Sequence, residues 1–290
     1  MMANSCDLLL ANANAVIPKV GIIKTNILIE NGRIKDITNN IGNVNCSKKI
    51  DVKDKFVLPG IIDPHVHYGV FSPVSVASIT ESRSAAVGGI TTIMRMLRTI
   101  GPYKQIICKH LEASQNAHFI DYSIHASIFS KNQLDDIQYL DSLGITSFKL
   151  YMNLGSTENR ILMDMDPYVS RLSPEIVNVS DELCYDLLEK LSNYDNSVVL
   201  VHAEDHVLCS KLINKNKGLG LISGNNVAMK LENLNPLDMW SKSRPPESET
   251  IAIKKIMQMA REFRSSLYFV HVGSSQALDT ILKEKQHGGC

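Results

Sequence analysis

The chain has 290 residues, of which 44% are hydrophobic and 21% charged, a balance typical of a globular protein with a substantial core. Lys and Arg together number 30, as do Asp and Glu, so the formal net charge is zero and no basic stripe suggests nucleic acid or a membrane surface as a partner. The N-terminus lacks the features of a signal peptide, and no apolar run is long enough to span a membrane. We therefore expect a cytoplasmic protein whose six scattered cysteines are reduced thiols rather than disulfides.

The first 56 residues carry short β-strand patterns. Asn31-Gly32 lies between two alternating apolar runs, and this dipeptide favours the two positive φ angles of a type I′ hairpin turn. Strand residues follow again at 50–60. A few short strands do not form a stable sheet alone, so we expect residues 1–56 to form part of a small β-domain beside a larger one.

From about residue 60, short apolar strands alternate with helical segments, which indicates a parallel sheet, open or closed. A complete (β/α)₈ barrel has eight strand–helix units, and we predict about six of the eight within residues 57–290. The fold class is thus α/β, an incomplete TIM-type barrel. The predicted strands are 61–68, 90–97, 118–129, 145–152, 197–204 and 267–274, and the predicted helices are 77–89, 103–115, 132–144, 180–194, 245–263 and 275–288.

Two histidines end the first barrel strand, in the sequence GIIDPHVHYG. His65 and His67 are two residues apart, so they point to the same face of the strand. The carboxyl ends of strands face the active site in this type of fold, and two imidazoles there form half of a metal site. The alternative is a pair of solvated loop histidines.

Three further strands end in groups that bind metals. Lys149, His202 and His271 each follow an apolar run at the equivalent strand end. Taken one at a time, each is explained by a satisfied core histidine or a lysine whose amine reaches solvent. Four of six strands ending in this way is much better explained by one shared metal centre.

These motifs together resemble the amidohydrolase superfamily, and within it the cyclic amidohydrolases: dihydropyrimidinase (hydantoinase), allantoinase and dihydroorotase. The resemblance extends from the N-terminal strands to Cys290, and it implies a (β/α)₈ barrel beside a small β-sandwich built from both chain ends, of which residues 1–56 would be part. The motifs that carry it are PGIIDPHVH (59–67), AAVGGITT (85–92), GITSFK (144–149), VHAED (201–205), SRPPESE (243–249) and FVHVGSS (269–275).

The resemblance implies two divalent metal ions, usually Zn²⁺. His65 and His67 would bind the more buried ion, and His202 and His271 the more exposed one. Lys149 would bridge the two ions as a carbamate formed with CO₂, because a neutral amine beside two dications traps CO₂ where an ammonium would be repelled. A hydroxide that bridges the metals would then attack the amide carbon of a cyclic substrate.

The sequence departs from the family at its end and at the substrate residues. The family's catalytic aspartate, from strand eight, has no counterpart here, so we expect a fragment of a longer polypeptide that is inactive and prone to aggregate alone. Dihydroorotases have Arg directly after the histidine pair and Asn after strand two. Here Tyr68 follows His67, and strand two ends in Arg98, which could itself bind a carboxylate. Hydantoinases have a tyrosine five residues after the lysine, and here that position is Leu154. The neighbouring Asn153 is, with Arg98, the candidate substrate-binding residue.

The leading prediction is a hydrolase that opens a small cyclic amide or ureide, most like dihydropyrimidinase, and that assembles as a dimer or tetramer when full length. Dihydroorotase and allantoinase remain alternatives. An alternative of another class is a non-catalytic assembly protein of the same family, although the metal ligands argue against it. Residues 155–179 form a longer connection than a compact barrel needs, either a lid over the site or a peripheral insertion.

Overall fold

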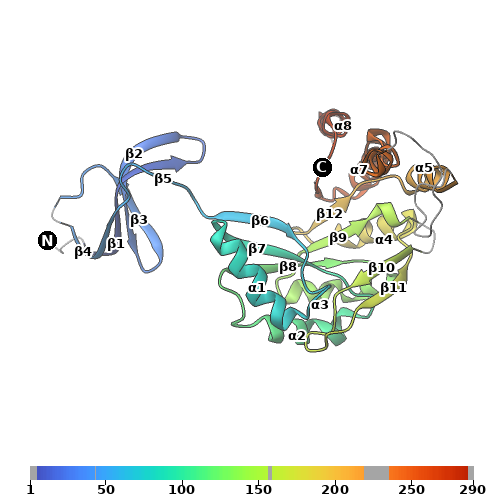
Figure 1. The fold of residues 1–290 in the computed structure, drawn as a ribbon, viewed down its shortest axis with the longest axis horizontal. Coiled ribbons are helices and arrows are strands. Elements are labelled where there is room, and N and C mark those ends of the chain that lie inside the picture. Colours follow the sequence, from blue (N-terminus) through green and yellow to red (C-terminus); the bar gives the residue numbers. More distant parts are fainter. Residues whose placement is uncertain (1–4, 43, 156–158, 219–234, 287–290) are drawn as a thin grey trace. The chain divides into compact units, whose positions relative to one another are not determined.

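A computed structural model describes residues 5–42, 44–155, 159–218 and 235–286 (Figure 1). The chain divides into two compact units, residues 1–61 and 62–290. Among the helices of the described ranges, none is both long enough and apolar enough to cross a bilayer.

The first unit is a single five-stranded sheet with the order β3-β2-β1-β4, in which β5 also pairs with β1. Asn31 and Gly32 connect β2 to β3 with φ angles of 53° and 71°, as the predicted hairpin turn requires. The strands are β1 (Ser5–Ile17), β2 (Gly21–Glu30), β3 (Arg33–Thr38), β4 (Asn45–Asp51) and β5 (Phe56–Val57).

The expectation that all cysteines are reduced is wrong for one pair. Cys6 on β1 and Cys46 on β4 are directly opposite each other on parallel strands, with Cα atoms 4.5 Å apart, and they form a disulfide. Their 40-residue separation in the sequence gave no sign of this contact. Among the described residues, Cys108, Cys184 and Cys209 are free thiols.

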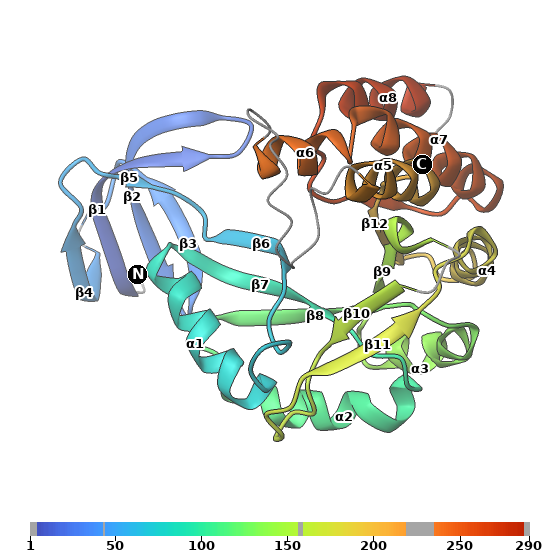
Figure 2. The same cartoon turned by 45° about the vertical axis from the view of Figure 1, so that its right-hand side comes forward.

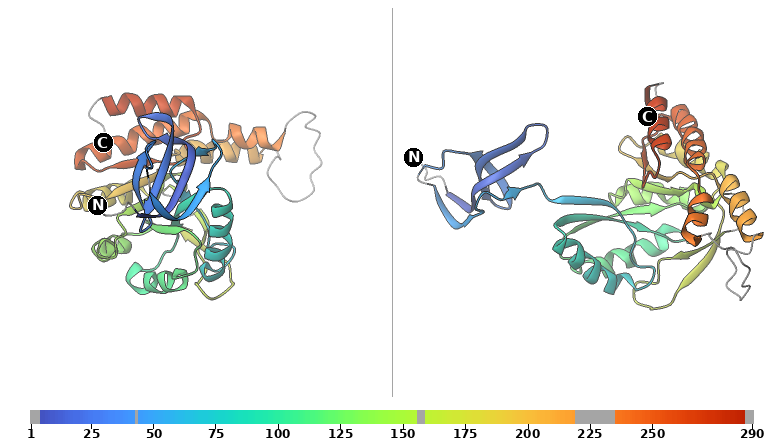
Figure 3. Two further views of the ribbon diagram at one scale, coloured as in Figure 1. Left: turned by 90° about the vertical axis from the view of Figure 1, so that its left-hand side faces the viewer. Right: turned by 45° about the horizontal axis from the view of Figure 1, so that its top comes forward.

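The second unit is built on a curled, parallel six-stranded sheet with the order β13-β12-β9-β8-β7-β6, which confirms the predicted incomplete barrel. Figures 2 and 3 show the curvature of this sheet, with the helices α1 to α3 lying along its outer side. All six predicted strands are present: β6 (Ile61–Val66), β7 (Ile90–Leu97), β8 (Asp121–Ser127), β9 (Ser147–Tyr151), β12 (Val198–His202) and β13 (Leu267–Phe269).

The helices follow the prediction at six places, and two more were not predicted. The helix expected at 132–144 is a 3₁₀ turn followed by a short α-helix, and residues 287 and 288 of the last predicted helix lie outside the described residues. The predicted ones are α1 (Val74–Val87), α2 (Tyr103–Ser114), η1 (Lys131–Asp136) with α3 (Ile137–Ser142), α4 (Asp181–Leu191), α7 (Pro246–Phe263) and α8 (Ser275–Gln286), and the unpredicted ones are α5 (His206–Gly218) and α6 (Pro236–Lys242).

The main core lies between the sheet and its helices, and it determines which strand residues face the barrel interior. Phe148 and Leu150 of β9 are buried in this core together with Leu187 of α4 and Ile256 of α7. Because side chains alternate along a strand, Lys149 between them points to the opposite, interior face. The sequence pattern of β9 therefore places a lysine inside the barrel.

The insertion at 155–179 forms an antiparallel hairpin of β10 (Asn159–Met163) and β11 (Ser173–Val177), while residues 156–158 lie outside the described part. The connection after β10 is bonded to the barrel loops. The backbone N–H of Asp164 donates to the carbonyl of Arg98 at 3.0 Å, and that of Met165 donates to the carbonyl of Gly69 at 2.7 Å. The start of this connection is thus fixed to the loops that follow β6 and β7.

Candidate metal centre

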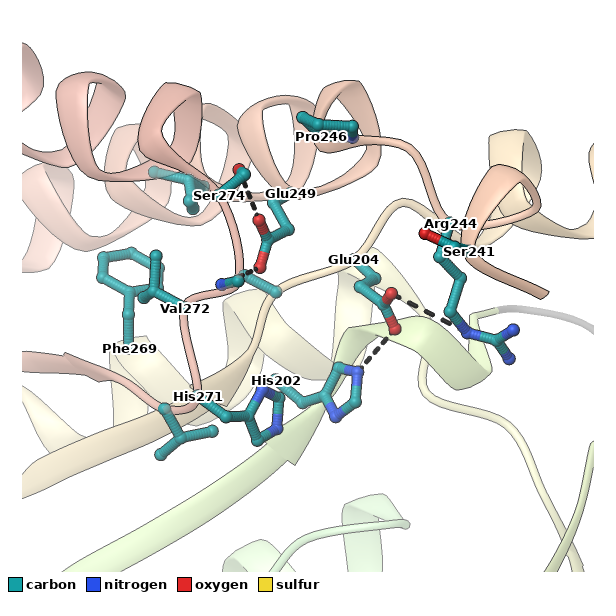
Figure 4. Close-up of a pocket in the computed structure, with 14 residues that line it drawn as sticks. His202, Glu204, Ser241, Arg244, Pro246, Glu249, Phe269, His271, Val272 and Ser274 are labelled. Atoms are coloured by element: carbon teal, nitrogen blue, oxygen red, sulfur yellow. Dashed lines mark hydrogen bonds and ion pairs between the residues drawn. The ribbon is translucent and has the colours of Figure 1, made fainter. Parts of the chain in front are cut away.

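The four predicted histidines lie side by side at the carboxyl ends of three strands, from both ends of the sheet. The ring centroids of His65 and His67 are 5.1 Å apart, and the ring of His65 stacks on that of His271 at 5.3 Å. His202, at the end of β12, contacts His271 at 4.4 Å (Figure 4). Residues from β6 and from the opposite edge of the sheet therefore converge on one place.

His65, His67, His202 and His271 form a histidine row, and the backbone is constrained at His65 and at His271. The carboxylate of Asp63 accepts a hydrogen bond from the backbone N–H of His65 at 3.1 Å, within β6. His271 has a φ of 39°, in the left-handed region that side chains other than glycine rarely adopt. Strained backbone of this kind is concentrated at functional sites, where the surrounding structure imposes it.

Lys149 is the buried member of the group. Its side chain is fully buried, its Nζ has no hydrogen-bond partner among the described residues, and the amine lies 5.2 Å from the centre of the Tyr151 ring. Burial lowers the pKa of the amine to about 7, because an ammonium without a counter-charge is unfavourable away from water. A substantial fraction of Lys149 is therefore a neutral amine near physiological pH.

His65, His67 and His271 are also held in the neutral form. Burial, followed by the nearby charge of Lys149, lowers the pKa of His65 to about 4. Loss of water and then the charge of Arg98 lower the pKa of His67, and burial lowers that of His271. A neutral imidazole keeps the nitrogen lone pair that binds a metal.

The residues present fit a divalent cation. The Nε2 atoms of His65 and His67 are 3.2 Å apart, close to the roughly 3.3 Å between two nitrogens on one tetrahedral zinc ion. Within the described ranges, no group of three or more His, Cys, Asp or Glu has the arrangement of a complete metal site. Lys149 is not among those residue types, and its amine, whose charge acts on His65, has no hydrogen-bond partner among the described residues.

His202 is oriented by a carboxylate that the sequence analysis did not single out. Its Nε2 lies 2.6 Å from Oε2 of Glu204, and the other oxygen of Glu204 is 3.8 Å from Nε of Arg244 (Figure 4). The Arg244 guanidinium in turn stacks on Trp240, 3.8 Å from the ring centre. If Nε2 of His202 donates to Glu204, Nδ1 is left with the lone pair that a cation would use.

A cavity of about 430 Å³ lies beside His202 and His271, with Glu204, Arg244 and Glu249 in its wall (Figure 4). Glu249, from the SRPPESE motif, accepts hydrogen bonds from the backbone N–H of Gly273 at 2.8 Å and from Oγ of Ser274 at 2.6 Å. This motif does begin a helix, as predicted, but its last glutamate also fixes the loop that follows His271.

The two predicted substrate residues are not among those that line this cavity. Arg98, at the end of β7, is mostly buried, and its charge lowers the pKa of His67. Asn153 lies in a 3₁₀ turn (Met152–Leu154), and its buried Oδ1 has no partner among the described residues. His206, which is half-buried, donates from Nδ1 to the carbonyl of Asn153 at 3.1 Å.

No protein-family model matches the chain, but individual proteins do. The chain is 26% identical over 280 residues to the L-hydantoinase of Paenarthrobacter aurescens, and the match covers 92% of this chain and 53% of that protein. It is 26% identical over 285 residues to a dihydroorotase of Methanosphaera stadtmanae, covering 97% and 56%. It is 25% identical over 280 residues to an allantoinase of Bacillus licheniformis, covering 94% and 56%. The chain thus spans just over half the length of these relatives.

Solved structures give the same picture. The L-hydantoinase of Arthrobacter aurescens superposes with a TM-score of 0.75 at 24% identity, over 98% of this chain and 56% of that one. A D-hydantoinase superposes with a TM-score of 0.74 at 26% identity, over 97% and 55%. The chain is therefore similar in sequence to a hydantoinase, a dihydroorotase and an allantoinase, and similar in fold to hydantoinases.

Proposed function

We propose that this chain provides the metal-binding part of an enzyme that hydrolyses a C–N bond in a cyclic amide or ureide. The observation that carries the proposal is the convergence of four histidines, from β6, β12 and the residues after β13, close to a buried lysine whose Nζ has no hydrogen-bond partner among the described residues. A purely structural role would leave a fully buried lysine unexplained.

In this proposal, His65 and His67 hold one divalent cation, and His202 and His271 hold a second. Zinc is the expected ion, because it favours imidazole nitrogen in tetrahedral sites. The two cations would polarise the substrate carbonyl and supply a water nucleophile at neutral pH. Glu204 fixes the ring of His202, and Glu249 fixes the loop of His271, so both rings are oriented before a ligand binds.

Lys149 is proposed to become a carbamate that bridges the two cations. Its neutral amine attacks CO₂, so that a bond forms between Nζ and carbon, one C=O electron pair moves to oxygen, and a proton leaves the nitrogen. The product exchanges an unpartnered amine for an anion with two oxygen ligands. Burial supports this step, because it lowers the pKa of Nζ to about 7 and so keeps a substantial fraction of the amine deprotonated near neutral pH.

For the substrate, we favour the ring of a dihydropyrimidine or hydantoin, with dihydroorotate and allantoin as the alternatives. The names of the relatives support all of these choices, since a hydantoinase, a dihydroorotase and an allantoinase match at nearly the same identity. Assembly into a dimer or tetramer is part of the proposal.

A second candidate, a non-catalytic assembly protein, is separated from the first by metal content. We expect about two zinc ions per chain by plasma mass spectrometry, and opening of at least one ring among dihydrouracil, hydantoin, allantoin and dihydroorotate. Because the relatives are nearly twice as long, both this chain and a longer polypeptide that contains it should be assayed. Absence of stoichiometric metal from both would reject the proposal.

A further inference from the structure

His125, on β8, is a buried histidine of the barrel interior. Its neighbours Ile124 and Ala126 are buried in the core between the sheet and its helices, so His125 points to the opposite, interior face. The ring is 2% exposed. Its Nε2 lies 3.0 Å from the carbonyl oxygen of Pro64, and its Nδ1 lies 2.6 Å from Oγ of Ser147. Both ring nitrogens therefore have a partner, one on β6 and the other on β9.

Packing alone does not explain an imidazole at this place. Met96 of β7 is in register with His125, and it packs inside the barrel against Leu200 and Val270. An apolar side chain would suit these neighbours, and it would avoid the cost of removing a polar ring from water. The two hydrogen bonds are therefore what an apolar residue at position 125 could not supply.

The bond to Pro64 joins two strands that are not neighbours in the sheet. The order β9-β8-β7-β6 places β7 between His125 and Pro64 (Figure 2). Ser147 is on the adjacent strand β9, and Lys149 follows it by two residues on the same face. His125 thus connects the backbone of β6 to the strand that contains Lys149.

The peptide unit between Pro64 and His65 is held at both of its polar groups. Its carbonyl accepts the bond from His125, and its N–H, which belongs to His65, donates to Oδ1 of Asp63 at 3.1 Å. The direction of the His65 side chain depends on the orientation of this peptide. Two side chains therefore determine where the ring of His65 lies relative to that of His67.

Ser147 determines which way the ring of His125 is turned. A carbonyl oxygen can only accept, so Nε2 of His125 is the nitrogen that carries the hydrogen for Pro64. Burial lowers the pKa of His125, so its ring is neutral and Nδ1 accepts from the Ser147 hydroxyl. Without this hydroxyl, the other tautomer and a flipped ring would no longer be disfavoured.

We propose that His125 is a positioning residue of the cation site, which fixes the backbone before His65 relative to β9 and Lys149, with Ser147 as the residue that orients it. This inference rests on the proposed function. It adds to that function a residue that binds neither the cation nor the substrate. Partners of this kind arrange the ligands before an ion binds, and their loss typically weakens metal affinity.

The test has one measurement with zinc and one without it. Zinc affinity is obtained by competition with a chromophoric chelator for the wild type, His125→Leu, His125→Gln and Ser147→Ala. Hydrogen exchange at the backbone N–H of His65 is followed by NMR in the metal-free proteins. Circular dichroism and urea unfolding establish that each variant is folded.

His110→Leu is the matched control, because it makes the same substitution at another buried histidine. His110 is 5% exposed, and its Nδ1 lies 3.2 Å from Nη2 of Arg95. Arg95 in turn pairs with Oδ2 of Asp164 at 2.7 Å, and both of these side chains are 1% exposed. The control thus removes a buried imidazole that is not bonded to β6 or β9.

His125→Leu should weaken zinc binding by at least about 10-fold relative to His110→Leu. Exchange at the His65 N–H should be at least roughly 10-fold faster in His125→Leu, because the peptide has lost the bond to its carbonyl. His125→Gln should retain most of the affinity, since its amide N–H can still donate to Pro64. Ser147→Ala should fall between the wild type and His125→Leu in both measurements.

Equal zinc affinities for His125→Leu and His110→Leu would overturn the inference, as would a His125→Gln variant as weak as His125→Leu. If His125→Leu does not fold, Ser147→Ala decides, and wild-type affinity and exchange in that variant would overturn it. Failure of the proposed function gives a different result, in which no form of the protein binds zinc or opens a ring. Exchange at His65 then decides, because equal rates in His125→Leu and His110→Leu would refute the positioning role.

Discussion

The Nε2 atoms of His65 and His67 lie 3.2 Å apart, with both rings on the same side of the end of β6. Two neutral imidazoles gain little by bringing their nitrogens together, unless a hydrogen or a cation lies between them. The pair is therefore the most direct place to test the metal centre.

Replacing His67 with Asn should weaken cation binding by at least about 10-fold, because it removes one ligand while leaving a side chain of similar polarity. Zinc affinity is measured by competition with a chromophoric chelator. His118→Asn is the control, because His118 bonds to the Tyr68 hydroxyl, outside the histidine row. Equal affinities for the two variants would contradict the assignment of His67.

Lys149 should carry a carbamate when CO₂ and zinc are both present. In protein equilibrated with ¹³C-labelled bicarbonate, we expect a carbamate carbon signal by NMR that is absent from Lys149→Gln. The same variant should lose roughly one equivalent of zinc, because the bridging oxygens are gone. A carbon signal of equal intensity in Lys149→Gln would place the modification on another residue.

The buried pair of Arg95 and Asp164 should be important for stability. Arg95→Met leaves Asp164 buried with a more distant cation, and loss of one member of a buried pair lowers the free energy of unfolding by about 3–5 kcal/mol. Lys109→Met is the matched control, because Lys109 pairs with Asp166 where their side chains are 48% and 40% exposed. An exposed pair contributes about 1 kcal/mol or less. Urea unfolding measures both, and similar losses would be inconsistent with this difference.

His110 should make stability depend on pH. Burial, and then the charge of Arg95, lower its pKa from 6.5 to about 3 in the folded chain. Below pH 6.5, the unfolded chain takes up a proton that the folded chain does not accept until near pH 3. This contribution is therefore complete above pH 6.5 and declines as the pH falls, by up to about 1.4 kcal/mol per pH unit.

The measurement is the urea midpoint at about pH 7.5 and about pH 5, converted to free energies of unfolding. Other histidines with lowered pKa values add to the slope in both proteins, so the difference between the wild type and His110→Gln isolates His110. The variant should lose less stability on acidification. A slope as steep as that of the wild type would show that His110 is not the source.

The edges of the second unit should promote self-association. β6 and β13 end the sheet, and Ile61, Ile62 and Tyr268 on them are 52%, 59% and 45% exposed. On α8, Leu278 and Leu282 are spaced by four residues on one face and are about half exposed. Exposed sheet edges and apolar helix faces of this kind favour association.

Leu278→Lys/Leu282→Lys should therefore shift the chain towards monomer in light scattering at a given concentration. Gln276→Lys adds charge to the same helix without removing apolar surface, and it should change little. If Gln276→Lys had the same effect as the double variant, net charge rather than this apolar face would explain the behaviour.

The sheet could be predicted from the sequence because its signals are local. Each of the six strands is a short apolar run. Asn31 and Gly32 are residue types that favour the positive φ angles of the hairpin turn they form. The histidine positions followed from the same pattern, since strand ends meet at one rim of such a sheet. His65 and His271 are 206 positions apart in the sequence. Their convergence was expected from the barrel topology and not from the residues beside them in the sequence.

The contacts that were missed depend on which distant segments meet. Cys6 and Cys46 pair through the register of two strands, which no spacing rule indicates. Arg95 looked like an interruption in an apolar strand, because its partner Asp164 comes 69 residues later, in an insertion without a recognisable pattern. Glu204 was visible beside His202, but only the structure gave the direction of its carboxylate.

The hydrogen bonds of Asp164 and Met165 limit how the loops at the carboxyl ends of the barrel strands can be re-engineered. Two consecutive N–H groups of the hairpin connection bond to Arg98 and to Gly69, in the loops after the first two barrel strands. The spacing of those loops is set by a third segment. A single loop transplanted from a relative would therefore lose its hydrogen bond to Asp164 or Met165. The three segments would have to be exchanged as one set.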